Sequence, residues 1–270
     1  MNVNKTLWEK GDFTKIAALM RESGAALADS LGVTPTMRVL DLGCGDGTTA
    51  VPLALSGVEV VGIDIAENLV AAGNQRAAEA GLDWLTFQEG DACELRGVDD
   101  HSFDLTISIF GAMFAPRPFE VAREMVRVTR PGGRIVMGNW IPGDATFVSQ
   151  LLKLSSSYTP PPPDGFVSPM TWGVEAHIID RFGQAGVLPE KISTAKEVFR
   201  FASPDIAEEH MSELFRRFYG PTMNAFEAAE KNGKAEEFSR GLVDLAKSQN
   251  ESKNGGISIP ATYLRVTIQL

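Results

Sequence analysis

The chain has 270 residues, of which 44% are hydrophobic and 22% charged, and its formal net charge is −10. This length allows one large α/β domain, or a core with a smaller appendage. A protein that follows a nucleic-acid backbone needs a basic stripe, and no cluster of Lys and Arg occurs, so we expect no nucleic-acid partner. No apolar run reaches the roughly 20 residues of a bilayer crossing, and the N-terminus has no signal-peptide core. We therefore expect a cytoplasmic protein with no membrane partner.

The first 140 residues carry a regular pattern. Ile16, Leu19, Met20 and Leu27 share one helical face, which predicts a mainly helical N-terminus. Short apolar runs then alternate with helical segments, an order typical of right-handed crossovers in a parallel sheet that is covered on both faces. The predicted strands are residues 38–42, 58–64, 85–90, 103–110 and 134–140, and the predicted helices lie near residues 48–56, 67–80 and 119–129.

The second half is less regular. A helix is predicted near residues 145–154, and four prolines at 160–163 then favour an extended surface connector. A helix over residues 170–183 and a strand over residues 196–201 follow. Two amphipathic helices are predicted from the apolar stripes Met211, Leu214, Phe215, Phe218 and Phe238, Leu242, Leu245. Alternation predicts a last strand over residues 261–270. Residues 204–257 would then form a helical lid on a core of residues 1–203 and 258–270.

A glycine-rich loop, Asp41-x-Gly43-x-Gly45-x-Gly47, follows the first predicted strand. Glycine lets the backbone turn sharply and approach a ligand that a Cβ atom would block. The helix that follows offers unpaired N–H groups and a partial positive charge. A dinucleotide-binding loop has the spacing Gly-x-Gly-x-x-Gly/Ala, and here the third glycine comes one residue early. Asp41 would be unfavourable beside a pyrophosphate but suits a ligand that bears an ammonium and a sulfonium group.

This loop resembles the first motif of class I S-adenosylmethionine-dependent methyltransferases. The resemblance covers residues 37–140 and implies a Rossmann-like fold, with a doubly wound, mostly parallel sheet of seven strands, N-terminal helices and a helical lid before the last strand. It implies S-adenosyl-L-methionine as cofactor. The cofactor-binding residues that it indicates are Phe13, Asp41, Gly43, Cys44, Gly45, Gly47, Asp64, Ile65, Asp91, Ala92, Ile109 and Phe110.

Two acids at strand ends carry specific expectations. Asp64 follows Gly43 by 21 residues and is expected to accept hydrogen bonds from the ribose hydroxyls. Its alternative role is that of N-cap for the next helix. Asp91 and Ala92 resemble the family motif at the adenine edge, where the acid accepts the exocyclic amine and the Ala92 N–H meets a ring nitrogen.

The end of the fourth strand bears on the substrate class. DNA and protein-amide N-methyltransferases place Asn/Asp-Pro-Pro-aromatic here, whereas this chain has Phe110-Gly111-Ala112-Met113-Phe114. Metal-dependent catechol-type enzymes place carboxylates nearby, and none occurs between Leu105 and Pro118. The sequence therefore predicts a metal-independent enzyme for a small-molecule acceptor. Small-molecule methyltransferases similar to those of ubiquinone and menaquinone biosynthesis close an N-terminal helix over the cofactor, a role we assign to Phe13, with core packing as the alternative.

Methyl transfer is an in-line displacement in which alignment alone contributes roughly 7–11 kcal/mol, so a general base is optional. Aromatic faces stabilise the positive charge that disperses from sulfur. His177 is the candidate base, with a surface position as the alternative. The candidate acceptor-binding residues are Met113, Phe114, Trp140, Trp172, Phe215 and Tyr219.

Two other functions remain open at this level. An NAD(P)-dependent oxidoreductase on a related sheet is disfavoured by Asp41 and the glycine spacing. A non-catalytic S-adenosylmethionine-binding protein would need the same cofactor residues as an enzyme. The two cysteines, Cys44 and Cys93, are expected to be free thiols. The pattern fits a monomer as well as a homodimer.

Overall fold

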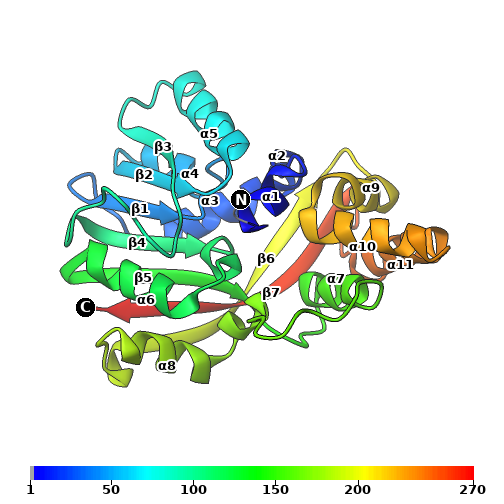
Figure 1. The fold of residues 1–270 in the computed structure, drawn as a ribbon. Helices are drawn as coiled ribbons and strands as arrows, with labels where there is room; N and C mark the ends of the chain where they lie inside the picture. The colour runs from blue at the N-terminus through cyan, green and yellow to red at the C-terminus, as the bar shows by residue number, and fades with distance from the viewer. Residues whose placement is uncertain (1–2) are drawn as a thin grey trace.

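The computed structural model describes residues 3–270. Seven strands form one sheet in the order β3-β2-β1-β4-β5-β7-β6 (Figure 1). Strands β1 to β5 are parallel, and β7 runs antiparallel to both β5 and β6. The predicted mostly parallel, seven-stranded sheet is confirmed. The strands are β1 Arg38–Leu42, β2 Glu59–Asp64, β3 Leu85–Glu89, β4 Phe103–Ile109, β5 Thr129–Trp140, β6 Ile192–Ser203 and β7 Ile257–Gln269.

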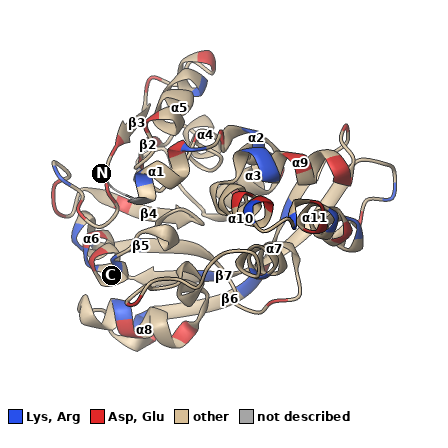
Figure 2. Cartoon of the chain, turned by 45° about the vertical axis from the view of Figure 1, so that its right-hand side comes forward, with Lys and Arg blue, Asp and Glu red and all other residues tan. Residues whose placement is uncertain are grey.

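Helices cover the central strands on both faces. From β1 to β3 each new strand is added toward one edge of the sheet, and from β4 to β5 toward the other edge. Because the crossovers are right-handed, α4 and α5 lie on one face of the sheet and α6 on the other. Strand β4 is therefore buried along nearly its whole length. Acidic and basic residues are interspersed on α5, α8 and α11 (Figure 2). The flanking helices are α3 Arg21–Ser30, α4 Ala50–Leu55, α5 Glu67–Glu79, α6 Pro118–Val128 and α8 Glu175–Gln184.

Strands β6 and β7 extend past the other strands and carry a helical layer at their far end (Figure 1). Three helices lie between these strands, so the prediction of two was wrong. Helix α10 buries Gly220, Thr222, Ala225 and Ala229, and these small residues give no apolar stripe in the sequence. The layer consists of α9 Glu208–Phe218, α10 Gly220–Lys231 and α11 Ala235–Gln249, with α7 Phe147–Ser156 packed against α10 and α11.

Four other predicted elements have different boundaries in the structure. Strand β6 starts before residue 196 and β7 before residue 261, because their pairing runs from Ile192 opposite Ile268 to Ser203 opposite Ile257. Much of β6 is exposed and shows no apolar alternation. Strand β5 includes Thr129, which pairs with Phe103 ahead of a shift in register. The helix predicted over residues 170–183 is broken at Val174, whose extended backbone separates the 3-10 helix Pro169–Gly173 from α8.

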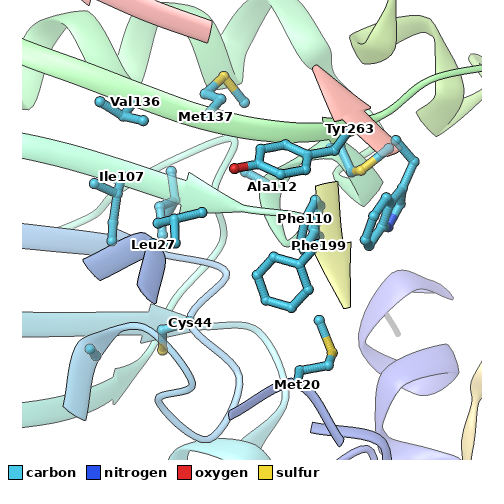
Figure 3. Packing of buried hydrophobic residues seen from close by; sticks show 14 of the residues in the cluster. Met20, Leu27, Cys44, Ile107, Phe110, Ala112, Val136, Met137, Phe199 and Tyr263 are labelled. Atoms are coloured by element: carbon cyan, nitrogen blue, oxygen red, sulfur yellow. The ribbon is translucent and has the colours of Figure 1, made fainter. Parts of the chain in front are cut away.

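The N-terminal segment packs over the carboxyl ends of the strands. It consists of α1 Val3–Glu9, α2 Thr14–Ala17, the 3-10 helix Ala18–Met20 and α3. Figure 3 shows Met20 facing Phe199, and Phe199 next to Phe110 and Tyr263 in the core. The N-terminal helices therefore share a hydrophobic core with the sheet, including its antiparallel strands β6 and β7. Among residues 3–270, no helix has the length and apolar character that a bilayer crossing requires.

Candidate active site

A cavity opens at the carboxyl ends of the parallel strands, beside the point between β1 and β4 where the strand order reverses. Ligands of open α/β sheets bind at this position. One half of its wall comes from the loops after β1, β2 and β3. The other half comes from the N-terminal helices, β5, β6, α7 and α9. The first half contains the predicted cofactor residues Asp41, Gly43, Cys44, Gly45, Asp64, Ile65, Asp91 and Ala92, and Phe13, Ile109 and Phe110 line the cavity beside it.

The glycine loop has the backbone that its sequence predicts. Gly43 has φ of 70°, and its N–H donates to the Ile63 carbonyl over 2.7 Å. Gly45 has φ of 56°, and a Cβ atom there would meet no protein atom within 4 Å. Because Gly45 lines the cavity, such an atom would project into the space of a ligand. The loop therefore forms a cradle that fits a group lying against its backbone.

Gly47 has a different reason to be glycine. It does not line the cavity, and a Cβ atom there would come within 2.6 Å of the Phe87 ring. The space beside Gly47 is thus filled by a core side chain, so packing accounts for the glycine, and its contact with the cofactor stays a prediction.

Asp64 accepts two backbone N–H groups at the cavity wall. Its Oδ2 accepts the Gly45 N–H over 2.8 Å, and its Oδ1 accepts the Ala66 N–H over 2.9 Å. The N-cap of α5 is Ala66, so Asp64 stabilises the turn ahead of the helix rather than capping it. Burial raises the pKa of Asp64, and the two N–H donors oppose that rise. Its carboxylate lines the cavity with lone pairs left for a ligand.

Asp41 is a second buried acid of the cavity wall. Its side chain is buried in the cavity wall, and no arginine or lysine pairs with it among residues 3–270. Burial, followed by the nearby Asp64 carboxylate, raises the pKa of Asp41 to about 7. A ligand that brings positive charge would relieve both effects.

Asp46 was not among the predicted site residues, although it lies in the glycine loop and lines the cavity. Its carboxylate pairs with Arg21 of α3 and lies near Arg76 of α5, which also donates to the Asp46 carbonyl over 2.5 Å. Both arginines lie far from Asp46 in sequence. The local sequence indicated a site role for Asp46 only through its position between Gly45 and Gly47 of the glycine loop.

The remaining cofactor candidates line the cavity farther along the sheet. Asp91 accepts the Cys93 N–H over 2.8 Å, and its other carboxylate oxygen lies 3.8 Å from Arg117. Cys44 and Cys93 are both free thiols, and burial raises the pKa of each. Among residues 3–270, no group of three or more His, Cys, Asp and Glu side chains is arranged to hold a metal ion. Metal-independent transfer stays a prediction.

The second half of the cavity, here called the aromatic end, has apolar walls. Phe110 stacks on Trp140 with ring centroids 3.6 Å apart and planes 7° apart, and Phe199 meets Phe110 edge-on at 5.1 Å. Phe110 has φ of 64°, a strained conformation for a residue other than glycine. The next residue, Gly111, lies close against the backbone of Gly43. The aromatic end consists of Trp8, Phe13, Phe110, Phe114, Trp140, Phe199, Phe201, Phe215 and Tyr219, with Ile16, Met20, Val148 and Leu151 beside them.

Aromatic contacts join the N-terminal helices to the helical layer. Trp8 meets Phe114 at 4.9 Å and Tyr219 at 6.1 Å, and Phe13 lies 6.2 Å from Tyr219. Tyr219 in turn meets Phe215 at 5.5 Å. Trp8, Phe199 and Phe201 were not predicted as site residues. Trp8 could have been predicted because it lies near Phe13 in the sequence. Nothing in the local sequence distinguished Phe199 and Phe201 from ordinary core residues.

Besides Gly47, three predicted residues lie outside the cavity wall. Met113 is buried in the core, and Trp172 is buried against Phe182 and Arg181. His177 is exposed on α8, which packs on α6. The alternative reading of His177, a surface helix residue, describes its position, and the structure gives it no contact with the cavity. The other acceptor candidates, Phe114, Trp140, Phe215 and Tyr219, all line the aromatic end.

Comparison with known proteins agrees with this geometry. Residues 40–137 match the model of a methyltransferase domain family. The chain is 34% identical to an uncharacterized protein of Mycobacterium tuberculosis over 245 residues, which are 90% of this chain and 86% of that protein. It is 39% identical to the demethylmenaquinone methyltransferase of Beutenbergia cavernae over 144 residues, 49% of this chain and 58% of that protein.

The fold is shared more widely. The phosphoethanolamine N-methyltransferase 2 of Haemonchus contortus, solved in complex with S-adenosyl-L-methionine, aligns with a TM-score of 0.56 and 18% identity over 92% of this chain and 52% of that chain. The matched family region runs from the glycine loop through the strands that bear Asp64 and Phe110. Together with the sheet order and the loop geometry, these findings identify the chain as a member of the class I S-adenosylmethionine-dependent methyltransferases.

Proposed function

We propose that this protein transfers the methyl group of S-adenosyl-L-methionine to a small-molecule acceptor that binds at the aromatic end of the cavity. The observation that carries the proposal is the continuity of the cavity, which runs from the glycine loop at one end to the aromatic end at the other. A cofactor against the loop and an acceptor at the aromatic end would face each other in one enclosed space. The demethylmenaquinone methyltransferase relative supports a small-molecule acceptor.

The residues of the glycine-loop half fit the cofactor. Gly45 leaves room for a ligand against its backbone, and Asp64 is held in place by two backbone N–H groups. Asp64 would accept the ribose hydroxyls, and Asp91 with Ala92 would meet the adenine edge. Asp41 would face the positively charged methionine portion. When bound, S-adenosylmethionine supplies a methyl group already activated by a sulfonium leaving group.

The protein's own contribution is alignment and exclusion of water. The N-terminal helices and residues 204–257 act as covers over the cavity, because Phe13, Phe215 and Tyr219 line it from those segments. Alignment in a closed site contributes roughly 7–11 kcal/mol, so a protein base is optional, and the transfer is metal-independent. The faces of Phe110 and Trp140 stabilise positive charge as it disperses from the sulfonium.

Calorimetry and turnover test the proposal together. S-adenosylhomocysteine should bind the wild-type protein, and Asp64→Asn should weaken that binding by about tenfold or more, because a neutral amide accepts hydrogen bonds less strongly than a carboxylate. Asp99→Asn, an exposed position outside the cavity, is the matched control. Release of S-adenosylhomocysteine from S-adenosylmethionine should depend on an added acceptor.

The two alternatives give different results in the same experiments. An oxidoreductase would bind NAD and not S-adenosylhomocysteine, which would overturn the cofactor assignment. A non-catalytic binder would bind S-adenosylmethionine and release no S-adenosylhomocysteine with any acceptor. Binding that Asp64→Asn leaves unchanged, in a folded variant, would contradict the ribose assignment.

A further inference from the structure

The charges of the cavity wall are unevenly placed. Its acids are Asp41, Asp46, Asp64 and Asp91, and all four belong to the glycine loop or to the ends of β1, β2 and β3. Among the described residues that line the cavity there is no Lys, Arg or His. The aromatic end is built mainly from hydrocarbon and aromatic surface; its polar groups are the hydroxyl of Tyr219 and the indole N–H groups of Trp8 and Trp140, and the side chain of Asn4 lines the same cavity from α1.

Tyr219 is placed to bind a ligand through its hydroxyl. The residue lies between α9 and α10, is 5% exposed and lines the cavity, and Trp8, Phe13 and Phe215 surround its ring. No hydrogen bond joins its hydroxyl to any residue in the 3–270 range, and the hydroxyl is not among the fully buried side-chain oxygens that lack a partner, so it is accessible from the cavity that the residue lines. By contrast, the Tyr263 hydroxyl donates to Glu197 over 2.5 Å. The Tyr219 hydroxyl is therefore able to form a hydrogen bond with a ligand in the cavity.

The charge of the acceptor follows from these walls. A carboxylate or phosphate at the aromatic end would lose its hydration and find no cation, which is strongly unfavourable. A cationic acceptor would meet the sulfonium of the cofactor across the shared cavity, where like charges repel. Flat aromatic walls favour a ring, which packs against them in offset or edge-on geometry.

We infer that the acceptor is an uncharged ring compound with a hydroxyl or carbonyl oxygen, and that Tyr219 orients it by donating a hydrogen bond to that oxygen. The inference rests on the proposed function and specifies the substrate class of the same site. Burial raises the pKa of Tyr219, which keeps the hydroxyl protonated and makes it a donor rather than a base.

Three related probes test the charge of the acceptor on the protein saturated with S-adenosylhomocysteine. 2-Naphthol is a neutral ring with a hydroxyl, 2-naphthoate is its anionic counterpart, and 2-naphthylmethylammonium is a cationic one. 2-Naphthol and the last probe are also compared with S-adenosylmethionine bound, so that the sulfonium is present for both. We expect 2-naphthol to bind at least tenfold more tightly than either charged probe. Equal or tighter binding of a charged probe, or no binding of 2-naphthol, would overturn the inference.

The role of Tyr219 is tested by removing only its hydroxyl. Tyr219→Phe should weaken 2-naphthol about three- to tenfold, the effect of one neutral hydrogen bond. Naphthalene lacks the oxygen, so its affinity should stay the same and the difference between the two probes should vanish in the variant. Tyr158→Phe, whose hydroxyl donates to Glu237 outside the cavity, is the control. A preference for 2-naphthol that survives in Tyr219→Phe would refute the hydrogen bond.

The same samples separate this inference from the proposed function. Binding of S-adenosylhomocysteine is measured first and should be equal in wild type, Tyr219→Phe and Tyr158→Phe. If wild type does not bind S-adenosylhomocysteine, the proposed function fails. If it does, and the probes bind in the opposite order, only the assignment of the acceptor fails.

Discussion

Arg21 and Asp46 form an ion pair between the N-terminal helices and the glycine loop, with Nη1 of Arg21 3.0 Å from Oδ1 of Asp46. The second guanidinium nitrogen also donates to the carboxylate, and Nη1 donates to the Thr48 hydroxyl. The Asp46 side chain is 3% exposed and that of Arg21 30%. Helix α3 thereby fixes the loop that forms one half of the cavity.

Removing this cation should therefore loosen the loop. Arg21→Met keeps most of the aliphatic chain and leaves the buried Asp46 carboxylate with only Arg76, whose Nη1 is 3.8 Å away. We expect the free energy of unfolding to fall by about 1–3 kcal/mol, measured by urea denaturation, and S-adenosylhomocysteine to bind more weakly. Arg123→Met removes an exposed pair with Glu120 and should change stability by about 0–1 kcal/mol. Equal losses in the two variants would contradict the anchoring role.

Asp41 should make stability depend on pH. Its folded-state pKa of about 7 lies above the ordinary value of about 3.9, so the folded protein keeps a proton that the unfolded chain releases. The contribution of Asp41 to stability is greatest below about pH 4 and declines as pH rises to about 7, by up to about 1.4 kcal/mol per pH unit. Urea denaturation of wild type and Asp41→Asn across this range should show the difference between them change with pH.

The same acid should link cofactor binding to pH. A cationic ligand beside Asp41 favours the ionised carboxylate, so binding at low pH must release its proton. S-adenosylmethionine affinity should therefore decline as pH falls below about 7 in wild type and stay flatter in Asp41→Asn. Parallel profiles in the two proteins would show that another group controls binding.

Gly45→Ala should weaken cofactor binding more than it weakens the fold. The added Cβ atom meets no protein atom, and the left-handed backbone costs roughly 1–2 kcal/mol for a residue other than glycine. In the cavity the same atom occupies ligand space, so we expect S-adenosylhomocysteine affinity to drop by about tenfold or more. Gly97→Ala has the same backbone region, with φ of 75°, on an exposed loop. It should lose similar stability and keep normal affinity.

The lid prediction concerns motion. Phe215 and Tyr219 line the cavity from residues 204–257, so that segment should become more ordered when the cavity fills. Amide hydrogen exchange of residues 205–245 should slow when S-adenosylhomocysteine and 2-naphthol are both bound. A rigid appendage or dimer contact is the alternative. Exchange that ignores both ligands and varies with protein concentration would end the lid interpretation in favour of a dimer.

The sequence by itself predicted the parallel sheet and most of the cofactor half. Those residues lie within one contiguous stretch in which each strand ends in a loop at the same edge of the sheet, so local spacing determines their neighbours. Gly45 and Asp64 line the cavity for that reason. Gly47 shows the limit of prediction from sequence. The glycine indicates an unusual backbone conformation, but the sequence does not reveal that the Phe87 ring fills the space beside it.

Only the tertiary structure decided the aromatic end. Its members include Trp8, Trp140, Phe199 and Tyr219, which lie far apart in the sequence. The long antiparallel strands β6 and β7 and the helices packed on them bring these residues together. An apolar stripe in a sequence tells which face of a helix is buried, not what covers it. Trp172 and Phe215 are both buried aromatic residues, yet only Phe215 lines the cavity. Helix α9 packs against α2 and brings Phe215 to Phe201, whereas Trp172 packs against Phe182 of α8.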